Sequence, residues 1–273
     1  MRRLFLVALL TTVTPLYGAI QYEFTHVTRT NSQHNSNLRL VGKAVIDGDR
    51  SRVDYLAEST RGAGQYVIST DGARELVIVD PQTRTYLVRQ ASDASRNLRT
   101  LGVEIANLKV DFDNLGAGPN IAGYPTNRYR LTMSYDITVN VGALPLKQRV
   151  QTVIEKWTTN AFGDISPAFF SNSTYDTGDP ELDKIIESET TRIPGFPLKQ
   201  EIGVTSHLLD RGVDASKASR NQVTQIVVTR IGSTTVNDSM FQVPASFTAA
   251  GEKSEARNDS GLQILSMTED PQN

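Results

Sequence analysis

The residues of this chain whose types could carry out chemistry are few and widely spaced. Its three histidines are His26, His34 and His207, and no two of them stand in a metal-binding spacing such as His-Glu-x-x-His. Two of them lie in strand or loop contexts with polar neighbours, where a lone histidine is most often a solvated side chain. No Gly-x-Ser-x-Gly nucleophile motif occurs. The glycines around Gly62-Ala63-Gly64 lack the lysine and helix start of a phosphate-binding loop, so a turn is expected there.

The acidic residues do not form a convincing metal site either. Asp47, Asp49 and Asp54 lie close in sequence, but a calcium site needs more oxygen ligands arranged around one loop. The chain contains no cysteine, which excludes disulfides, thiolate metal sites and a cysteine nucleophile. We therefore expect no metal, no cofactor and no catalytic residue, and a protein that is not an enzyme.

The first 19 residues resemble an export signal. Arg2 and Arg3 precede the apolar run Leu4–Leu10, Pro15 breaks that run, and Gly18 or Ala19 offers a small residue for cleavage. The apolar run is too short to predict a membrane span, and without a cysteine no lipid anchor is expected at the mature N-terminus. The sequence thus predicts a periplasmic or secreted protein.

The charge of the chain argues against a nucleic-acid partner. Of 28 basic residues two lie in the expected signal, which leaves 26 against 30 acidic residues and a formal charge of −4 for the mature chain. Nucleic-acid binding depends on basic surfaces that neutralise phosphates, and this balance is acidic.

Most of the mature chain reads as antiparallel strands joined by turns. Asp47-Gly48-Asp49 and Asp71-Gly72 are strong hairpin signals, because glycine accepts the positive φ of tight turns. A shift of apolar parity between Ile105 and Leu108 predicts a bulge. The expected strands are 20–24, 38–46, 52–56, 65–70, 75–79, 85–89, 103–112, 129–141, 146–159, 198–208, 221–231 and 240–243, and a short helix is possible over 92–100.

The segment from Tyr129 to Val141 has the clearest pattern. Every odd-numbered residue in it is apolar and every even-numbered residue is polar, which is typical of a strand with one dry face. At about 3.3 Å per residue the strand reaches roughly 40 Å, longer than most strands. A second long strand, Leu146–Thr159, follows a short loop at Gly142–Pro145, and its parity shifts near Thr152. We expect Trp157 to lie with Tyr129 and Tyr135 on the dry face.

One helix is well signalled. Asp179 can cap it, Pro180 suits its first position, and Pro194 and Gly195 end it. Such a helix is only roughly 20 Å long, so it covers part of the dry face. Either loops, with Phe169, Phe170 and the segment 193–198, fill the core completely, or an apolar cavity remains between sheet and helix. The residues expected to line that cavity are Tyr129, Leu131, Met133, Tyr135, Ile137, Trp157, Leu182, Ile185 and Ile186.

The order of several motifs resembles that of the LolA-like superfamily of exported bacterial proteins, and of an uncharacterised family within it. The motifs are Val79-Asp80-Pro81-Gln82-Thr83-Arg84-Thr85-Tyr86, Ile121-Ala122-Gly123-Tyr124, Trp157-Thr158-Thr159, Ile193-Pro194-Gly195-Phe196-Pro197-Leu198 and Phe241-Gln242-Val243-Pro244-Ala245-Ser246-Phe247. The resemblance implies a mainly β (α+β) fold, a strongly curved antiparallel half-barrel sheet with one or more helices on its concave face. It covers roughly residues 20–247, expected as a single domain between the signal, 1–19, and a flexible tail, 248–273.

The resemblance also implies a function, because characterised members bind acyl chains of lipoproteins or lipids, or sense misfolded envelope proteins. We expect an exported soluble protein that binds a hydrophobic ligand, a lipid or the acyl chain of a lipoprotein, between sheet and helix. The alternative is a module for protein interaction or stress sensing in the cell envelope, with a protein partner and no lipid.

Overall fold

The computed structural model describes residues 18–30, 38–90, 103–141, 144–163, 165, 188, 191–209 and 220–250. Its strands are β1 (Ile20–Thr30), β2 (Leu38–Asp47), β3 (Arg50–Tyr55), β4 (Tyr66–Ser69), β5 (Glu75–Asp80), β6 (Thr85–Gln90), β7 (Val103–Ala117), β8 (Asn127–Val141), β9 (Leu144–Thr159), β10 (Phe196–Leu208), β11 (Arg220–Ser233) and β12 (Thr248–Ala249). Two short 3-10 helices are described, η1 (Asn160–Phe162) and η2 (Asp238–Phe241).

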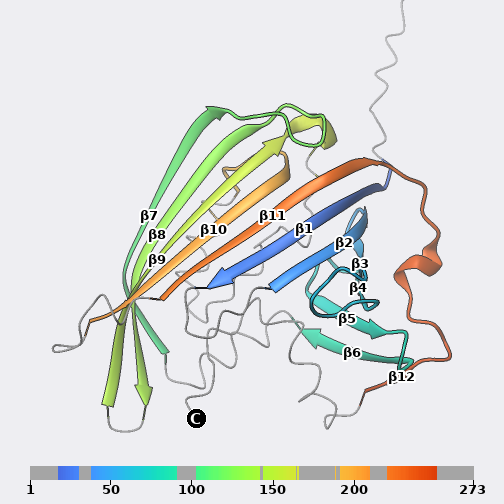
Figure 1. Cartoon of the computed structure of the whole chain (residues 1–273), viewed down its shortest axis with the longest axis horizontal. Coiled ribbons are helices and arrows are strands. Elements are labelled where there is room, and N and C mark those ends of the chain that lie inside the picture. The colour runs from blue at the N-terminus through green and yellow to red at the C-terminus, as the bar shows by residue number, and fades with distance from the viewer. Residues whose placement is uncertain are drawn as a thin grey trace, which may run out of the picture.

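All the strands belong to one 12-stranded sheet that twists and curves (Figure 1), in the order β12-β6-β5-β4-β3-β2-β1-β11-β10-β9-β8-β7. Strand β1 pairs on one side with β2 and on the other with β11, both antiparallel. It therefore joins the meander β1–β6 to the second group of strands, β7–β11. The expectation of a mainly β protein with a curved sheet is confirmed, and the pairing is antiparallel except between β6 and the two-residue strand β12, which are parallel.

The turn and bulge signals of the sequence are also confirmed. Gly48 and Gly72, at the predicted hairpin turns, have φ of 59° and 73°. The register of β7 against β8 shifts between Ala106 and Lys109, where the change of apolar parity predicted a bulge.

The strand expected at 240–243 is wrong, because its first two residues belong to η2 and the next two, Gln242 and Val243, are in no strand. The side chain of Asn237 accepts a hydrogen bond from the backbone N–H of Ser239, which begins a tight helical turn. That turn buries Phe241 against Val45, Tyr66, Ile68 and Val79. A helix at 92–100 and nearly all of the helix expected after Asp179 lie outside the described residues.

The two faces of the sheet bury different clusters. Here the inner face means the one that carries Tyr22 and Phe24 of β1, and the outer face is the opposite one. On the inner face, the core across the middle of the sheet consists of Ile20, Tyr22, Phe24, Ala44, Ile46, Val53, Phe162, Phe196, Leu198, Ile226 and Val228. The Phe24 ring of β1 packs so closely on Gly42 of β2 that a Cβ on Gly42 would lie 2.5 Å from the ring. The outer face of β2–β5 is covered by the chain around η2.

Candidate functional site

The candidate site is the inner face of the four strands β7–β10. Residues that stand directly opposite in an antiparallel pair share a face of the sheet. Leu131 of β8 stands between Phe112 of β7 and Ile154 of β9, and Ile154 is opposite Ile202 of β10. These residues belong to one apolar inner cluster, which consists of Leu131, Met133 and Ile154, packed by Ile105, Leu108, Val110, Phe112 and Ile202.

Five of the predicted site residues lie together on this face. Tyr129, Leu131 and Met133 are buried, and Leu131 has no exposed surface. Tyr135 and Ile137, further along β8, are half-buried. The period-two pattern therefore identified the face of β8 correctly. Burial raises the pKa of the Tyr135 phenol, and its hydrogen bond with Thr152 opposes part of that effect.

Trp157 lies on the opposite face, contrary to our expectation. It stands across from Arg128 of β8 and Lys199 of β10, and both cations contact its ring. The Arg128 Cζ is 5.2 Å and the Lys199 Nζ is 4.3 Å from the ring centroid. The cause is that β9 pairs with β8 without a register shift from Asn127 to Val141, so the expected parity shift near Thr152 does not occur. Trp157 therefore cannot line a site on the inner face.

The other three predicted residues, Leu182, Ile185 and Ile186, lie outside the described residues. Just after them, Arg192 reaches the inner face, with its Cζ 4.7 Å from the centroid of the Phe112 ring. Phe112 in turn stacks on Tyr129 at a centroid distance of 6.0 Å. Thus a cation from the segment before β10 packs at one end of the apolar inner cluster.

The outer face of the same strands is charged. Glu155 accepts hydrogen bonds from Arg128 at 2.5 Å and from Arg130, whose Nη2 lies 2.7 Å away. Toward the tip of the β8–β9 hairpin, Arg149 pairs with Asp136 at 2.8 Å. The Arg149 and Asn107 contacts lower the pKa of Asp136 to about 2. The charges are thus largely paired with each other on the outer face, whereas the inner face carries the apolar surface.

Sequence reasoning missed two polar residues of the inner face, Lys156 and Gln200. Lys156 stands between Tyr129 of β8 and Gln200 of β10, so these three residues form one row, here called the inner polar row. Lys156 is 8% exposed and Gln200 is 1% exposed. Burial lowers the pKa of Lys156 to about 8. The tight β8–β9 connection was a signal that could have revealed this, since pairing Val141 with Leu144 and counting back along both strands puts Lys156 opposite Tyr129.

His26 is a second correction. It is 1% exposed rather than solvated, and it lies in line with the inner polar row, separated from Gln200 only by Ile226. Its Nε2 is 3.3 Å from the Thr28 hydroxyl, which is 3.0 Å from that of Thr224. Burial lowers the pKa of His26 to about 4, so the ring is neutral at pH 7.

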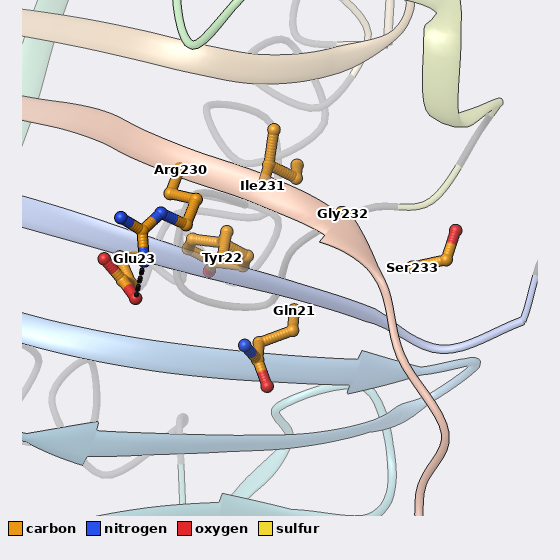
Figure 2. Close-up of a pocket in the computed structure, with 7 residues that line it drawn as sticks. All are labelled: Gln21, Tyr22, Glu23, Arg230, Ile231, Gly232 and Ser233. Atoms are coloured by element: carbon orange, nitrogen blue, oxygen red, sulfur yellow. Dashed lines mark hydrogen bonds and ion pairs between the residues drawn. The ribbon is translucent and has the colours of Figure 1, made fainter.

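A separate small pocket opens where β1 pairs with β11 (Figure 2). It has a volume of about 150 Å³ and is lined by Gln21, Tyr22, Glu23, Arg230, Ile231, Gly232 and Ser233. Two of these lining residues, Arg230 and Glu23, form an ion pair of 3.3 Å. Ligand pockets usually have volumes of about 300–1,000 Å³ and are mostly apolar, so this pocket is too small and too polar for a lipid.

Metal-binding and membrane-spanning features are both missing from the described residues. They contain no group of three or more histidine, cysteine or acidic residues placed to hold a metal ion. Nor does any helix among them have the length and apolar character needed to cross a membrane.

Comparison with known proteins identifies no family for this chain. No protein-family sequence profile matches it, and no curated protein sequence matches it. Among solved structures, a LolA superfamily protein from Nitrosomonas europaea aligns over 83% of this chain and 91% of its own, with 9% sequence identity and a TM-score of 0.30. Similarity at this level carries no argument about fold or function, so the function has to be inferred from the geometry of the chain itself.

Proposed function

We propose that this protein binds a hydrophobic ligand, a lipid or an acyl chain, on the inner face of β7–β10, and that it is a binding protein and not an enzyme. The observation that supports the proposal most directly is the apolar inner cluster on one side of a sheet whose other side is charged.

The ligand-contacting region within this proposal is the half-buried part of the face. Leu131 and Ile154 are fully buried and serve the fold. Tyr135 and Ile137 are only half-buried and continue the same apolar surface toward the hairpin tip. A mostly apolar surface with a few polar groups is the usual character of a lipid or small-molecule site. We further propose that the helix expected between Asp179 and Pro194 lies over this face, as in a LolA-like half-barrel, with Leu182, Ile185 and Ile186 toward the ligand.

Export to the periplasm or beyond is part of the same proposal. It rests on the signal-like segment 1–19, since Arg2 and Arg3 precede an apolar run and small residues follow at the expected cleavage point. In that compartment, acyl chains of lipids and lipoproteins are the ligands to be expected.

The alternative, a module that binds another envelope protein through a sheet edge, has less support. The edge strand β7 has two register shifts against β8, and Asn107 has a φ of 57° within the first of them. Lys109, Asp111 and Asp113 add charges along the strand. Bulges and charges of this kind hinder the addition of a further strand at an edge.

Mass spectrometry of molecules that co-purify with the native protein, prepared without detergent, tests the proposal. We expect an acyl lipid in amounts comparable to the protein, and protein free of lipid that also fails to take up added lipid would contradict the proposal.

A matched pair of variants locates the site. Ile137→Glu places a charge on the inner face and should lower lipid retention at least about tenfold, because burying an unpaired charge is costly. Thr138→Glu, one residue along on the outer face, should leave retention unchanged.

A further inference from the structure

The inner polar row sets a lysine on the inner face of β7–β10, where Arg192, packed on Phe112, is the other charged side chain described above. The residues flanking Lys156 on the same face are Tyr129 and Gln200 across the strands, and Ile154 and Thr158 along β9. None of them is acidic. The nearest acidic residues in sequence and register, Glu155 and Glu201, are on the outer face, where they pair with Arg128, Arg130 and Lys199. Within the described residues, no ion pair or hydrogen bond involves the ammonium of Lys156.

Gln200 gives a second, independent observation at the same place. Its side chain is 1% exposed, and its Oε1 has no hydrogen-bond partner in the part of the chain that the structure describes. Buried amides are nearly always hydrogen-bonded, so an unsatisfied one calls for an explanation. Since Gln200 stands directly opposite Lys156, an acceptor placed between them could take a hydrogen bond from Lys156 and, with the amide turned so that Nε2 occupies the unsatisfied position, from Gln200 as well.

The row lies at one end of the inner-face stripe of β9. From Lys156 this stripe continues through Ile154, Thr152, Val150 and Gln148, in which apolar and polar residues alternate, over about 26 Å along the strand. Met133 and Tyr135 of β8 lie beside this stripe. A head group held at the row would therefore direct its acyl chain along β8 and β9 toward the half-buried Tyr135 and Ile137.

We propose that Lys156 and Gln200 anchor the carboxylate of a single-chain anionic amphiphile, of the fatty-acid class, whose acyl chain lies along the inner face of β8 and β9. The proposal rests on the proposed function, since it adds the head-group chemistry to the same site. The Lys156 ammonium donates to one carboxylate oxygen. The Gln200 amide, turned about its last bond, donates from Nε2 to the other oxygen. A charge-assisted hydrogen bond of this kind is stronger than a neutral one and is strengthened by exclusion of water.

The low pKa of Lys156 agrees with this assignment. Burial without a partner lowers it to about 8, so the amine is still mainly protonated at neutral pH and can receive an anion. A bound carboxylate would favour the charged form and raise that pKa.

Isothermal titration calorimetry of the full, delipidated protein with laurate and with lauryl alcohol tests the proposal, because the two ligands share a chain and differ in charge. We expect the wild-type protein to bind laurate at least about tenfold more tightly than the alcohol. Lys156→Met should lose this preference while keeping its affinity for the alcohol. Lys147→Met removes an exposed lysine from the outer face of the same strand and should behave as the wild type.

The outcomes separate the two proposals. If the wild type binds both ligands equally, or if Lys156→Met keeps the preference for laurate, the head-group assignment is wrong and the apolar site stands. If the wild type binds neither ligand, the proposed function itself is contradicted. Circular dichroism of each variant shows that the comparison is made between folded proteins.

Discussion

Replacing Lys156 by methionine should make the protein more stable at pH 7. The lysine is 8% exposed, faces no acidic side chain of its own sheet face, and has its pKa lowered from 10.5 to about 8 by burial. Each unit of pKa shift corresponds to about 1.36 kcal/mol, so the buried ammonium costs the folded state about 3 kcal/mol. Methionine has a similar shape and no charge. We therefore expect Lys156→Met to raise the free energy of unfolding by as much as about 3 kcal/mol, since apolar replacement of buried charges is often stabilising.

The pH dependence gives this prediction a second, independent readout. Between pH 8 and pH 10.5 the unfolded chain holds a proton on Lys156 that the folded chain has released. Stability rises with pH wherever the unfolded state binds more protons, so the wild type gains stability across this window. Lys156→Met lacks the titrating group and should not gain it. The advantage of the variant is thus largest below pH 8 and vanishes near pH 10.5.

Urea unfolding followed by circular dichroism at several pH values measures both effects, with Lys147→Met as the control. Lys147 is exposed on the outer face of the same strand, so its replacement should change stability by no more than about 0.5 kcal/mol. A variant at Lys156 that is no more stable than the wild type at pH 7, or an advantage that stays constant up to pH 10.5, would refute the reasoning. A stability cost at Lys156 would agree with a role in binding, because proteins retain destabilising buried charges mainly at active and binding sites.

Three further predictions concern the fold around the site. Met133→Asp should lower the free energy of unfolding by about 4 kcal/mol or more, because the side chain is buried in the apolar inner cluster. Normal solubility and an unchanged unfolding midpoint would show that this face is not buried. Trp157→Ala should lower the free energy of unfolding by about 3–5 kcal/mol, because the side chain is buried. The folded variant should still bind laurate with unchanged affinity, because Trp157 lies on the outer face. A loss of affinity in calorimetry would place Trp157 in the site. Burial lowers the pKa of His26 to about 4, so the unfolded chain takes up a proton that the folded chain excludes, and the free energy of unfolding should fall by about 3 kcal/mol between pH 6.5 and pH 4. In urea titrations, His26→Gln should lose less stability over that range than the wild type. An identical loss would exclude His26 as a source of acid sensitivity.

Several features of this protein follow from local sequence. The alternation from Tyr129 to Val141 identified both the long strand and the residues on its buried face, because side chains in a strand point to opposite sides in turn. Gly48 and Gly72 located two hairpins, and the parity change after Ile105 located the bulge in β7. These signals are short-range, since each depends only on residues that are neighbours along the chain.

Pairing between strands decided the rest. On β9, the mixed sequence around Thr152 suits either face, and only its unbroken register with β8 places Lys156 inside and Trp157 outside. His26 is buried because β1 lies in the middle of the sheet, between β2 and β11, and the pairing partner on β11 lies about 200 residues further along the chain. The sequence by itself determined which segments are strands and which face of the clearest strand is apolar. The tertiary structure alone decided which polar side chains share that face, because burial of a polar residue depends on the neighbours that long-range pairing brings beside it.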